Sequence, residues 1–164
     1  MKNKTQKIVL SSLLAALVCV ATMLIKVPSP LKGYVNLGDC VVLLSGWVLS
    51  PVYAFLTAGV GSALADVFSG YVIYAPATFV IKGLMALICC LAIRTAKKKS
   101  LAMKILSGVI AEIVMVGGYY IFEGFMYGFI SSALNIPANA VQGVFGIVLG
   151  LMLIKIFEKS DIVK

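Results

Sequence analysis

Gly33-Tyr34-Val35-Asn36-Leu37-Gly38-Asp39 stands between two apolar runs, and the expected fold follows from this stretch in both directions. Its two glycines, asparagine and aspartate are typical of turns and helix starts. We therefore expect a loop over roughly 27–36, followed by a helix whose first turn contains Asp39. Because the flanking sequence is apolar on both sides, this loop is expected at the rim of a helical bundle in a membrane. The placement of the basic residues, described below, assigns it to the outer rim.

The composition predicts an integral membrane protein with an all-α fold. Of the 164 residues, 62% are hydrophobic and only 12% are charged, and the mean hydropathy is +1.08. A soluble domain carries about 25% charged residues, so half that share cannot keep a whole surface in water. The chain, 1–164, is expected to form a single transmembrane domain, because short loops leave no room for a second.

Apolar segments of about 20 residues are long enough to cross a membrane as helices. The chain offers six such segments, of which the second is short, so a bundle of six transmembrane helices is expected. Pro51 and Pro76 stand at helix starts, where proline is favoured. The predicted helices span roughly residues 7–26, 37–49, 52–68, 76–94, 101–127 and 137–157.

Basic residues gather in three clusters between the apolar runs: near the N-terminus, over 94–104 and near the C-terminus. Six helices place these three clusters on the same side of the membrane. The positive-inside rule then predicts a multi-pass protein of the cell membrane with both termini in the cytoplasm. Since the clusters account for the net charge of +8 and do not line a helix face, nucleic acid is not expected as a partner.

Ionisable residues inside membrane spans are costly and usually mark function. Most of those found here are expected in the outer half of the bundle, whereas Glu112 is expected near mid-membrane. Asn139 and Gln142 are three residues apart and therefore share one face of the last helix. Their amides need partners that lipid cannot offer. The ionisable residues in or beside the predicted spans are Asp39, Asp66, Lys82, Glu112 and Glu123.

These side chains predict an outward-facing pocket with aromatic walls and a few polar groups, as in small-molecule sites. A structural interpretation stays open: Asp66 and Lys82 form a buried ion pair, Asp39 stabilises the positive end of its helix, and tyrosines form an interfacial belt. The predicted substrate-binding residues are Tyr34, Asn36, Asp39, Tyr74, Phe79, Lys82, Tyr119, Glu123, Asn139 and Gln142.

Small residues repeat at helical spacing in the first predicted helix. Ser11, Ala15 and Cys19 form one row, and Ser12 and Ala16 form a second. Such rows let helices approach closely. They indicate either packing inside the bundle or a docking surface for another membrane protein.

The sequence shows no catalytic or metal-binding pattern. Histidine is absent, and no glycine-rich loop precedes a basic residue as in a phosphate-binding loop. We therefore expect no enzyme activity, no cofactor and no metal, and ATP would have to be bound by another subunit. The four cysteines form no CxxC pair and are expected to pack as small hydrophobic residues.

Three blocks of this sequence form a recognisable pattern. They are Gly33–Asp39 with Pro51-Val52-Tyr53; Gly59–Asp66, Gly70-Tyr71, Tyr74–Phe79 and Lys82-Gly83-Leu84; and Pro137-x-Asn139-x-x-Gln142-x-x-x-Gly146. These blocks resemble the substrate-binding S components of energy-coupling factor (ECF) vitamin transporters. The resemblance covers nearly the whole chain and is greatest to the branch grouped with riboflavin-type S components, which includes proteins for hydroxymethylpyrimidine and for pyridoxine-like B6 vitamers.

The resemblance implies a high-affinity subunit that captures a water-soluble vitamin or precursor from outside. It also implies association with a membrane-embedded T component and two ATPase subunits, and toppling in the membrane to release the substrate. The family docks through Ala-x-x-x-Ala in its first helix. The matching row here is Ala15-x-x-x-Cys19, which departs at its second position, with Ser11 and Ala16 adjacent. The first loop is implied to act as a lid.

Lys82 and two amides between tyrosines suit a pyrimidine or pyridine ring, so hydroxymethylpyrimidine or a B6 vitamer is the expected substrate. The residues do not separate these two. Three alternatives stay open: an S component for another micronutrient such as riboflavin, a small membrane enzyme with Glu112 as its acid, and a membrane scaffold without a ligand. The enzyme would need a second acid or a nucleophile beside Glu112, and the scaffold would not concentrate polar groups at one depth.

Overall fold

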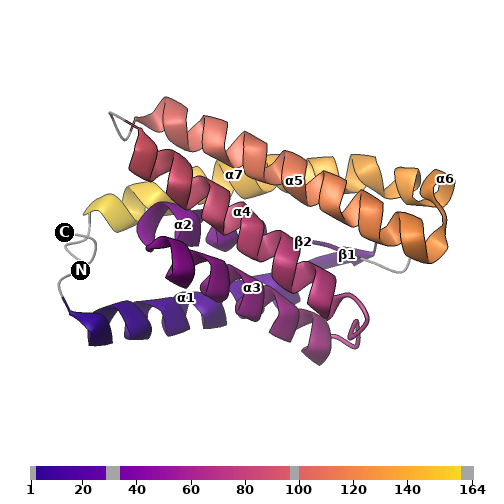
Figure 1. Cartoon of the computed structure of the whole chain (residues 1–164), viewed down its shortest axis with the longest axis horizontal. Helices are drawn as coiled ribbons and strands as arrows, with labels where there is room; N and C mark the ends of the chain where they lie inside the picture. The colour runs from indigo at the N-terminus through magenta and orange to yellow at the C-terminus, as the bar shows by residue number, and fades with distance from the viewer. Residues whose placement is uncertain (1–2, 29–33, 97–99, 160–164) are drawn as a thin grey trace.

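The apolar segments become helices because a backbone surrounded by lipid must satisfy its hydrogen bonds within the segment. The computed structural model describes residues 3–28, 34–96 and 100–159. Over these ranges the chain forms a bundle of long helices with a small hairpin near one end (Figure 1). Its elements are α1 (Lys4–Leu24), β1 (Lys26–Pro28), β2 (Tyr34–Asn36), α2 (Asp39–Val48), α3 (Pro51–Phe68), α4 (Ala75–Thr95), α5 (Leu101–Tyr127), α6 (Phe129–Ser132), the short 3-10 helix η1 (Ala133–Asn135) and α7 (Ile136–Lys159).

Within the described residues, five helical stretches are long and apolar enough to cross a membrane. They are α1, α3, α4, α5 and the stretch Phe129–Lys159, which includes α7. The shorter apolar helix α2 is the sixth. The predicted all-α membrane bundle with six helices is confirmed.

Two connections contain structure where the sequence suggested loops. β1 pairs with β2 in an antiparallel hairpin, with Val27 opposite Val35. α6 and η1 make a helical turn between α5 and α7, over a segment that was expected to be a loop. Residues 29–33 of the loop predicted over roughly 27–36 lie outside the described residues.

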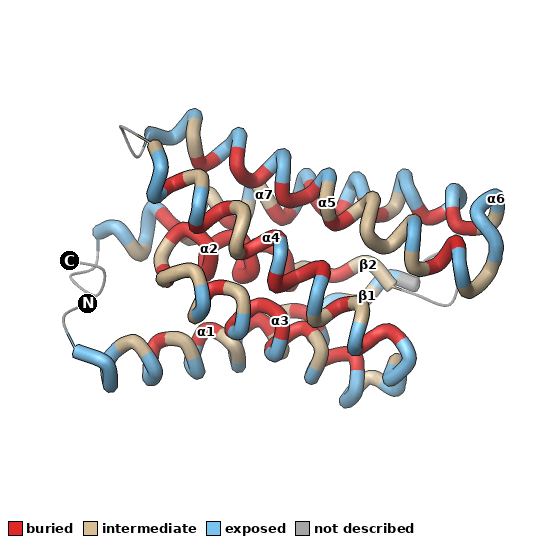
Figure 2. Tube along the Cα trace, in the orientation of Figure 1, coloured by how far each residue is buried: buried red, intermediate tan, exposed pale blue. Residues whose placement is uncertain are grey.

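The short helix α2 lies inside the bundle and is buried along almost its whole length (Figure 2). It packs against α1, α3, α4 and α7. Gly46 allows a close approach to α4, since a Cβ there would lie 2.5 Å from the carbonyl oxygen of Ala86. With ten residues, α2 is only about 15 Å long. Its first residue, Asp39, is 1% exposed and is enclosed by the surrounding helices.

The two ends of the bundle differ in chemistry. The start of α1, the end of α4, the start of α5 and the end of α7 lie at one end, and the α6 turn lies at the other (Figure 1). At the first end, Lys104 of α5 forms an ion pair with Glu158 of α7, with Nζ and Oε1 2.5 Å apart. Described basic residues near this end are Lys4, Lys7, Arg94, Lys155 and Lys159. The lysines of the predicted basic clusters at positions 2, 97–99 and 164 lie outside the described residues.

Candidate functional site

A small polar cavity lies between β2 of the hairpin and the helices α3, α4, α5 and α7. Its volume is about 30 Å³, which is room for about one water molecule. Aromatic rings and polar groups alternate around it, as in small-molecule sites. The lining residues are Tyr34, Asn36, Asp66, Tyr71, Tyr74, Thr78, Tyr119, Glu123, Asn139 and Gln142.

The cavity brings together side chains from distant parts of the sequence. Of the ten residues predicted to bind substrate, the lining includes Tyr34, Asn36, Tyr74, Tyr119, Glu123, Asn139 and Gln142. They come from β2, α5, α7 and the residue before α4. The other three predicted residues, Asp39, Phe79 and Lys82, are not among the lining residues.

One side of the hairpin is attached to the end of α3. The Tyr34 hydroxyl donates to Asp66 Oδ1 at 2.6 Å, and the Tyr34 ring lies 4.8 Å from the ring of Tyr71. Lys26 of β1 donates to Ser69 Oγ. Burial and the neighbouring Asp66 carboxylate raise the pKa of Tyr34. Its hydroxyl therefore stays protonated and able to donate at neutral pH.

The other side of the hairpin is attached to α7 through Gln142. The backbone N–H of Asn36 donates to Gln142 Oε1 at 2.8 Å. The Asn36 side chain also accepts from the backbone N–H of Gly38 at 2.8 Å, which fixes the turn between β2 and α2. The hairpin thus closes the cavity by hydrogen bonds to α3 on one side and to α7 on the other.

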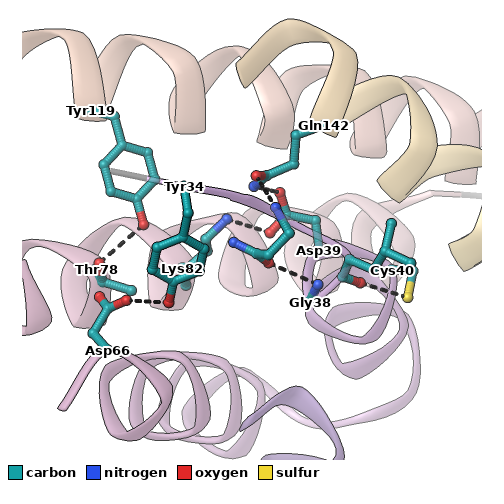
Figure 3. A network of polar contacts seen from close by, with 11 residues as sticks. Tyr34, Gly38, Asp39, Cys40, Asp66, Thr78, Lys82, Tyr119 and Gln142 are labelled. Carbon is teal, nitrogen blue, oxygen red and sulfur yellow. Dashed lines mark hydrogen bonds and ion pairs between the residues drawn. The ribbon is translucent and has the colours of Figure 1, made fainter. Parts of the chain in front are cut away.

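A buried ion pair lies beneath the cavity (Figure 3). Lys82 of α4 donates to Asp39 Oδ1, and Gln142 Nε2 donates to Asp39 Oδ2 at 2.5 Å. The exposed fractions of Lys82 and Asp39 are 3% and 1%. The alternative ion pair between Asp66 and Lys82 is wrong, because Lys82 pairs with Asp39 and Asp66 receives the hydroxyl of Tyr34. Asp39 also makes no side-chain cap of α2, although it lies in the first turn.

Phe79 belongs to the packing between α3 and α4. Its ring lies 5.5 Å from that of Phe55 in an edge-on arrangement, and it fills the space left by Gly59. The preceding residue, Thr78, faces the cavity and lies 3.0 Å from the hydroxyl of Tyr119. Phe79 is therefore not among the lining residues of this cavity, whereas its neighbour Thr78 is.

Two lining residues, Asp66 and Thr78, were not among the site residues predicted from the sequence. Tyr74, Thr78 and Lys82 are spaced by four residues and share one face of α4, so this spacing could have identified Thr78. Asp66 was considered only as a helix-end or ion-pair residue. Its bond to Tyr34 depends on the hairpin, which the sequence pattern did not predict.

The α6–η1 turn supports the far wall of the cavity. Asn135 of η1 donates to Glu123 Oε2 at 2.8 Å, and the hydroxyl of Tyr74 donates to Glu123 Oε1 at 3.4 Å. The Ser132 hydroxyl donates to the carbonyl of Tyr120 at 2.8 Å. These bonds attach the C-terminal part of α5 to the α6–η1 turn and to the residue before α4.

Glu112 lies at the level of the ion pair, between α5 and α7. It is 6% exposed, and neither carboxyl oxygen has a hydrogen-bond partner among the described residues. A Cβ added to Gly146 would lie 2.9 Å from Glu112 Oε1 and 2.8 Å from Asp39 Cβ. Glu112 is thus a close neighbour of Asp39 and is not isolated from the other buried charges. In the described part of the chain, no three acidic, Cys or His side chains gather to hold a metal.

The small-residue rows of α1 face two environments. Thr57 of α3 donates to the carbonyl of Ser11 at 3.3 Å, and Gly61 of α3 approaches the carbonyl of Ala15. Ser11, Ala15 and Cys19 are half-buried, whereas Ala16 is exposed. One row therefore packs partly inside the bundle, and the neighbouring row is open at the surface.

Together, the membrane-spanning helices and the small polar cavity near one end define a multi-pass membrane protein with a candidate small-molecule site. The chain belongs to the family of ECF-type riboflavin transporter S components, whose model matches residues 2–159. It is therefore a membrane transporter subunit that serves vitamin uptake, and the resemblance found in the sequence is confirmed. Nothing in this family assignment supports the enzyme or scaffold alternatives.

Individual relatives agree with this assignment. The chain is 28% identical over 169 residues to the thiamine precursor transporter HmpT of Lactococcus lactis subsp. cremoris, covering 99% of this chain and 94% of the relative. It is 36% identical over 134 residues to a protein of Pyrococcus woesei named "Uncharacterized protein in gap 3'region", covering 81% and 88%. A solved structure of the S component of a bacterial ECF transporter has the same fold, with 23% identity, a TM-score of 0.79, and coverage of 96% and 98% of the two chains.

Proposed function

We propose that this S component binds a small, single-ring vitamin or vitamin precursor, either hydroxymethylpyrimidine or a B6 vitamer, in the cavity under the hairpin. The observation that carries this proposal is the lining of that cavity, where tyrosine rings alternate with amides and carboxylates. Tyrosine faces can stack on a heterocycle, and the polar groups can bind its hydroxyl and ring-nitrogen atoms. The likeness to a thiamine precursor transporter supports a pyrimidine.

Riboflavin is the second candidate, because the family model carries its name. A single ring suits the site better, since the lining residues already nearly close the cavity to about 30 Å³. A single-ring substrate requires a modest expansion, whereas a three-ring flavin requires a much larger one. The single-ring vitamins are therefore the preferred candidate substrates, ahead of riboflavin.

Substrate entry requires the hairpin to move outward. The strand β2 supplies Tyr34 and Asn36 to the lining and is attached by hydrogen bonds to Asp66 and Gln142. Breaking these bonds would open the cavity without separating the long helices. The hairpin thus takes the part of a lid that the family resemblance assigns to the first loop.

In the proposed transport cycle, the chain works with a membrane-embedded T component and two ATPase subunits and topples to release its substrate. The basic end of the bundle would face the cytoplasm, with both termini, and the cavity would face outward. Docking would use the small-residue surface of α1 formed by Ser11, Ala15, Ala16 and Cys19. Of these, Ala16 is the most exposed in the bundle.

The substrate is tested by mass spectrometry of the small molecules released when the detergent-purified protein is denatured, combined with thermal shifts in a vitamin panel. We expect hydroxymethylpyrimidine or a B6 vitamer to be released or to raise the unfolding temperature. A shift with riboflavin alone would support the second candidate. No shift with any vitamin would contradict the proposal.

The docking surface is tested by Ala16→Trp. The added ring would lie on the exposed face of α1, so substrate binding should persist while uptake by the complete transporter is lost. Ile113→Trp, on the exposed face of α5, is the matched control and should retain uptake. Normal uptake by the Ala16→Trp variant would exclude this face of α1 as the docking surface.

A further inference from the structure

The side-chain amide of Gln142 forms one hydrogen bond with an acceptor and one with a donor. Its Nε2 donates to Asp39 Oδ2 at 2.5 Å, and its Oε1 accepts from the Asn36 backbone N–H at 2.8 Å. A carboxylate without a proton can only accept hydrogen bonds, and a backbone N–H can only donate. The two partners therefore allow a single orientation of the amide.

The orientation depends on the buried ion pair. Lys82 donates to the second oxygen of Asp39, which keeps that carboxylate paired and directed between α4 and α7. Neither Lys82 nor Asp39 lines the cavity, whereas Gln142 does. Gln142 connects the ion pair to the cavity by a hydrogen bond, and Lys82 also lies 5.6 Å from the ring of the lining residue Tyr119.

The partner on the other side of Gln142 belongs to the segment that must move. Asn36 lies on β2 and lines the cavity, and a ring-sized substrate enters only if this strand is displaced. Its displacement withdraws the Asn36 N–H and leaves Gln142 Oε1 facing the cavity as a hydrogen-bond acceptor. Nε2 stays bound to Asp39, so the amide cannot turn over to present a donor.

We propose that Asp39 and Lys82 are positioning residues that determine specificity: they fix Gln142 as an acceptor for a substrate exocyclic amino group that replaces the Asn36 N–H. This inference rests on the proposed function. It predicts a preference for an aminopyrimidine over a pyrimidine that carries a carbonyl at the same position. The carbonyl would face Gln142 Oε1, leaving two acceptors without a hydrogen between them.

The test compares binding of hydroxymethylpyrimidine, which carries an exocyclic amino group, with binding of its analogue in which a carbonyl replaces that group. Isothermal titration calorimetry on the full-length protein in detergent gives both affinities. We expect the wild-type protein to bind the amino form at least tenfold more tightly, or about 1.4 kcal/mol. The double variant Asp39→Asn with Lys82→Met removes both charges and lets the Gln142 amide turn over, so the ratio should fall at least tenfold.

Two further variants keep the test decisive. Gln142→Met preserves side-chain length but removes the amide, so this variant should bind both forms with similar affinity. It therefore tests the inference even if the double variant Asp39→Asn with Lys82→Met fails to fold. The double variant Lys104→Met with Glu158→Gln removes the other ion pair, far from the cavity, and should keep the wild-type ratio.

The outcomes separate the two proposals. An unchanged preference in Gln142→Met, or equal binding of both forms by the wild-type protein, would overturn the role of Asp39 and Lys82 and leave the proposed function standing. Failure of the wild-type protein to bind either pyrimidine would overturn this inference together with the assignment of a pyrimidine substrate.

Discussion

Two ion pairs among the described residues, Lys82–Asp39 and Lys104–Glu158, join helices in different surroundings. Both carry one cation and one carboxylate, and both connect segments far apart in the sequence. The first is buried on both sides, whereas Glu158 in the second is 51% exposed. Asp39 also accepts from Gln142, while the second pair ends at the basic surface of the bundle.

This difference separates two uses of charge in one membrane protein. An exposed pair contributes little to stability, because water screens it. A buried pair is costly to form and costly to break, so its retention needs a reason other than stability. The position of Lys82–Asp39 directly beneath the cavity offers that reason.

The largest expected effect compares the two pairs directly. Lys82→Met leaves the Asp39 carboxylate buried without its cation and should destabilise the protein by about 3–5 kcal/mol. Lys104→Met leaves Glu158 able to reach water and should cost about 1 kcal/mol or less. Thermal unfolding in detergent measures both. Equal losses would mean that burial does not distinguish the pairs.

The second prediction compares two glycines one turn apart on α7. Gly146→Ala places a methyl group 2.8 Å from Asp39 Cβ and 2.9 Å from Glu112 Oε1, so overpacking should cost about 1–3 kcal/mol. Gly150→Ala meets its nearest neighbours at 3.3 Å and should be nearly neutral. Denaturation of both variants under the same conditions tests whether α7 is packed more tightly beside the buried ion pair than one turn further along the helix. A more harmful Gly150→Ala would reverse the comparison.

The third prediction concerns the cavity. Asn139→Ala removes an amide that lines it and should weaken substrate binding about tenfold, or about 1.4 kcal/mol, with little change in unfolding temperature. Val144→Ala, at an exposed position of the same helix, is the matched control and should leave the dissociation constant unchanged. Unaltered affinity in Asn139→Ala would remove this part of the proposed site.

The smallest effect concerns the hairpin and its dependence on pH. The raised pKa of Tyr34 means that the closed hairpin favours the neutral phenol, whereas an opened hairpin exposes a phenol with the usual pKa of about 10. The resulting stabilisation of the closed form is complete below about pH 10 and declines as the pH rises further. It should amount to about 1 kcal/mol, as for a single hydrogen bond.

A fluorophore on the exposed side chain of β1 measures this opening. Val27→Cys in a Cys19→Ala background provides the label site, since the other three cysteines are buried. In the labelled protein that retains Tyr34, the fraction of molecules with an open hairpin should increase above pH 10. In the labelled Tyr34→Phe variant, this fraction should not respond to the titration of a phenol. The same pH response in both proteins would assign it to another group.

The helices and most of the cavity residues could be predicted because they depend on repeating patterns. Apolar length predicts the spans, and the spacing of Asn139 and Gln142 places both on one face of α7. The partners of Asp39 and Asp66 could not be predicted, because each bond joins residues that only the folded bundle brings together. Phe79 and Thr78 are adjacent in sequence, and only the packing against Phe55 decides which of them faces the cavity.

The length of α2 has a consequence for how the protein enters the membrane. A helix of about 15 Å covers only half of a hydrocarbon core about 30 Å thick, so the insertion machinery has little reason to recognise this segment alone. We expect α2 to enter the membrane together with α3 as a helical hairpin. The neighbouring helices then shelter α2 from lipid. Synthesis of the chain would then settle its topology only after α3 has left the ribosome, and truncation before that point should leave Asp39 outside the bilayer.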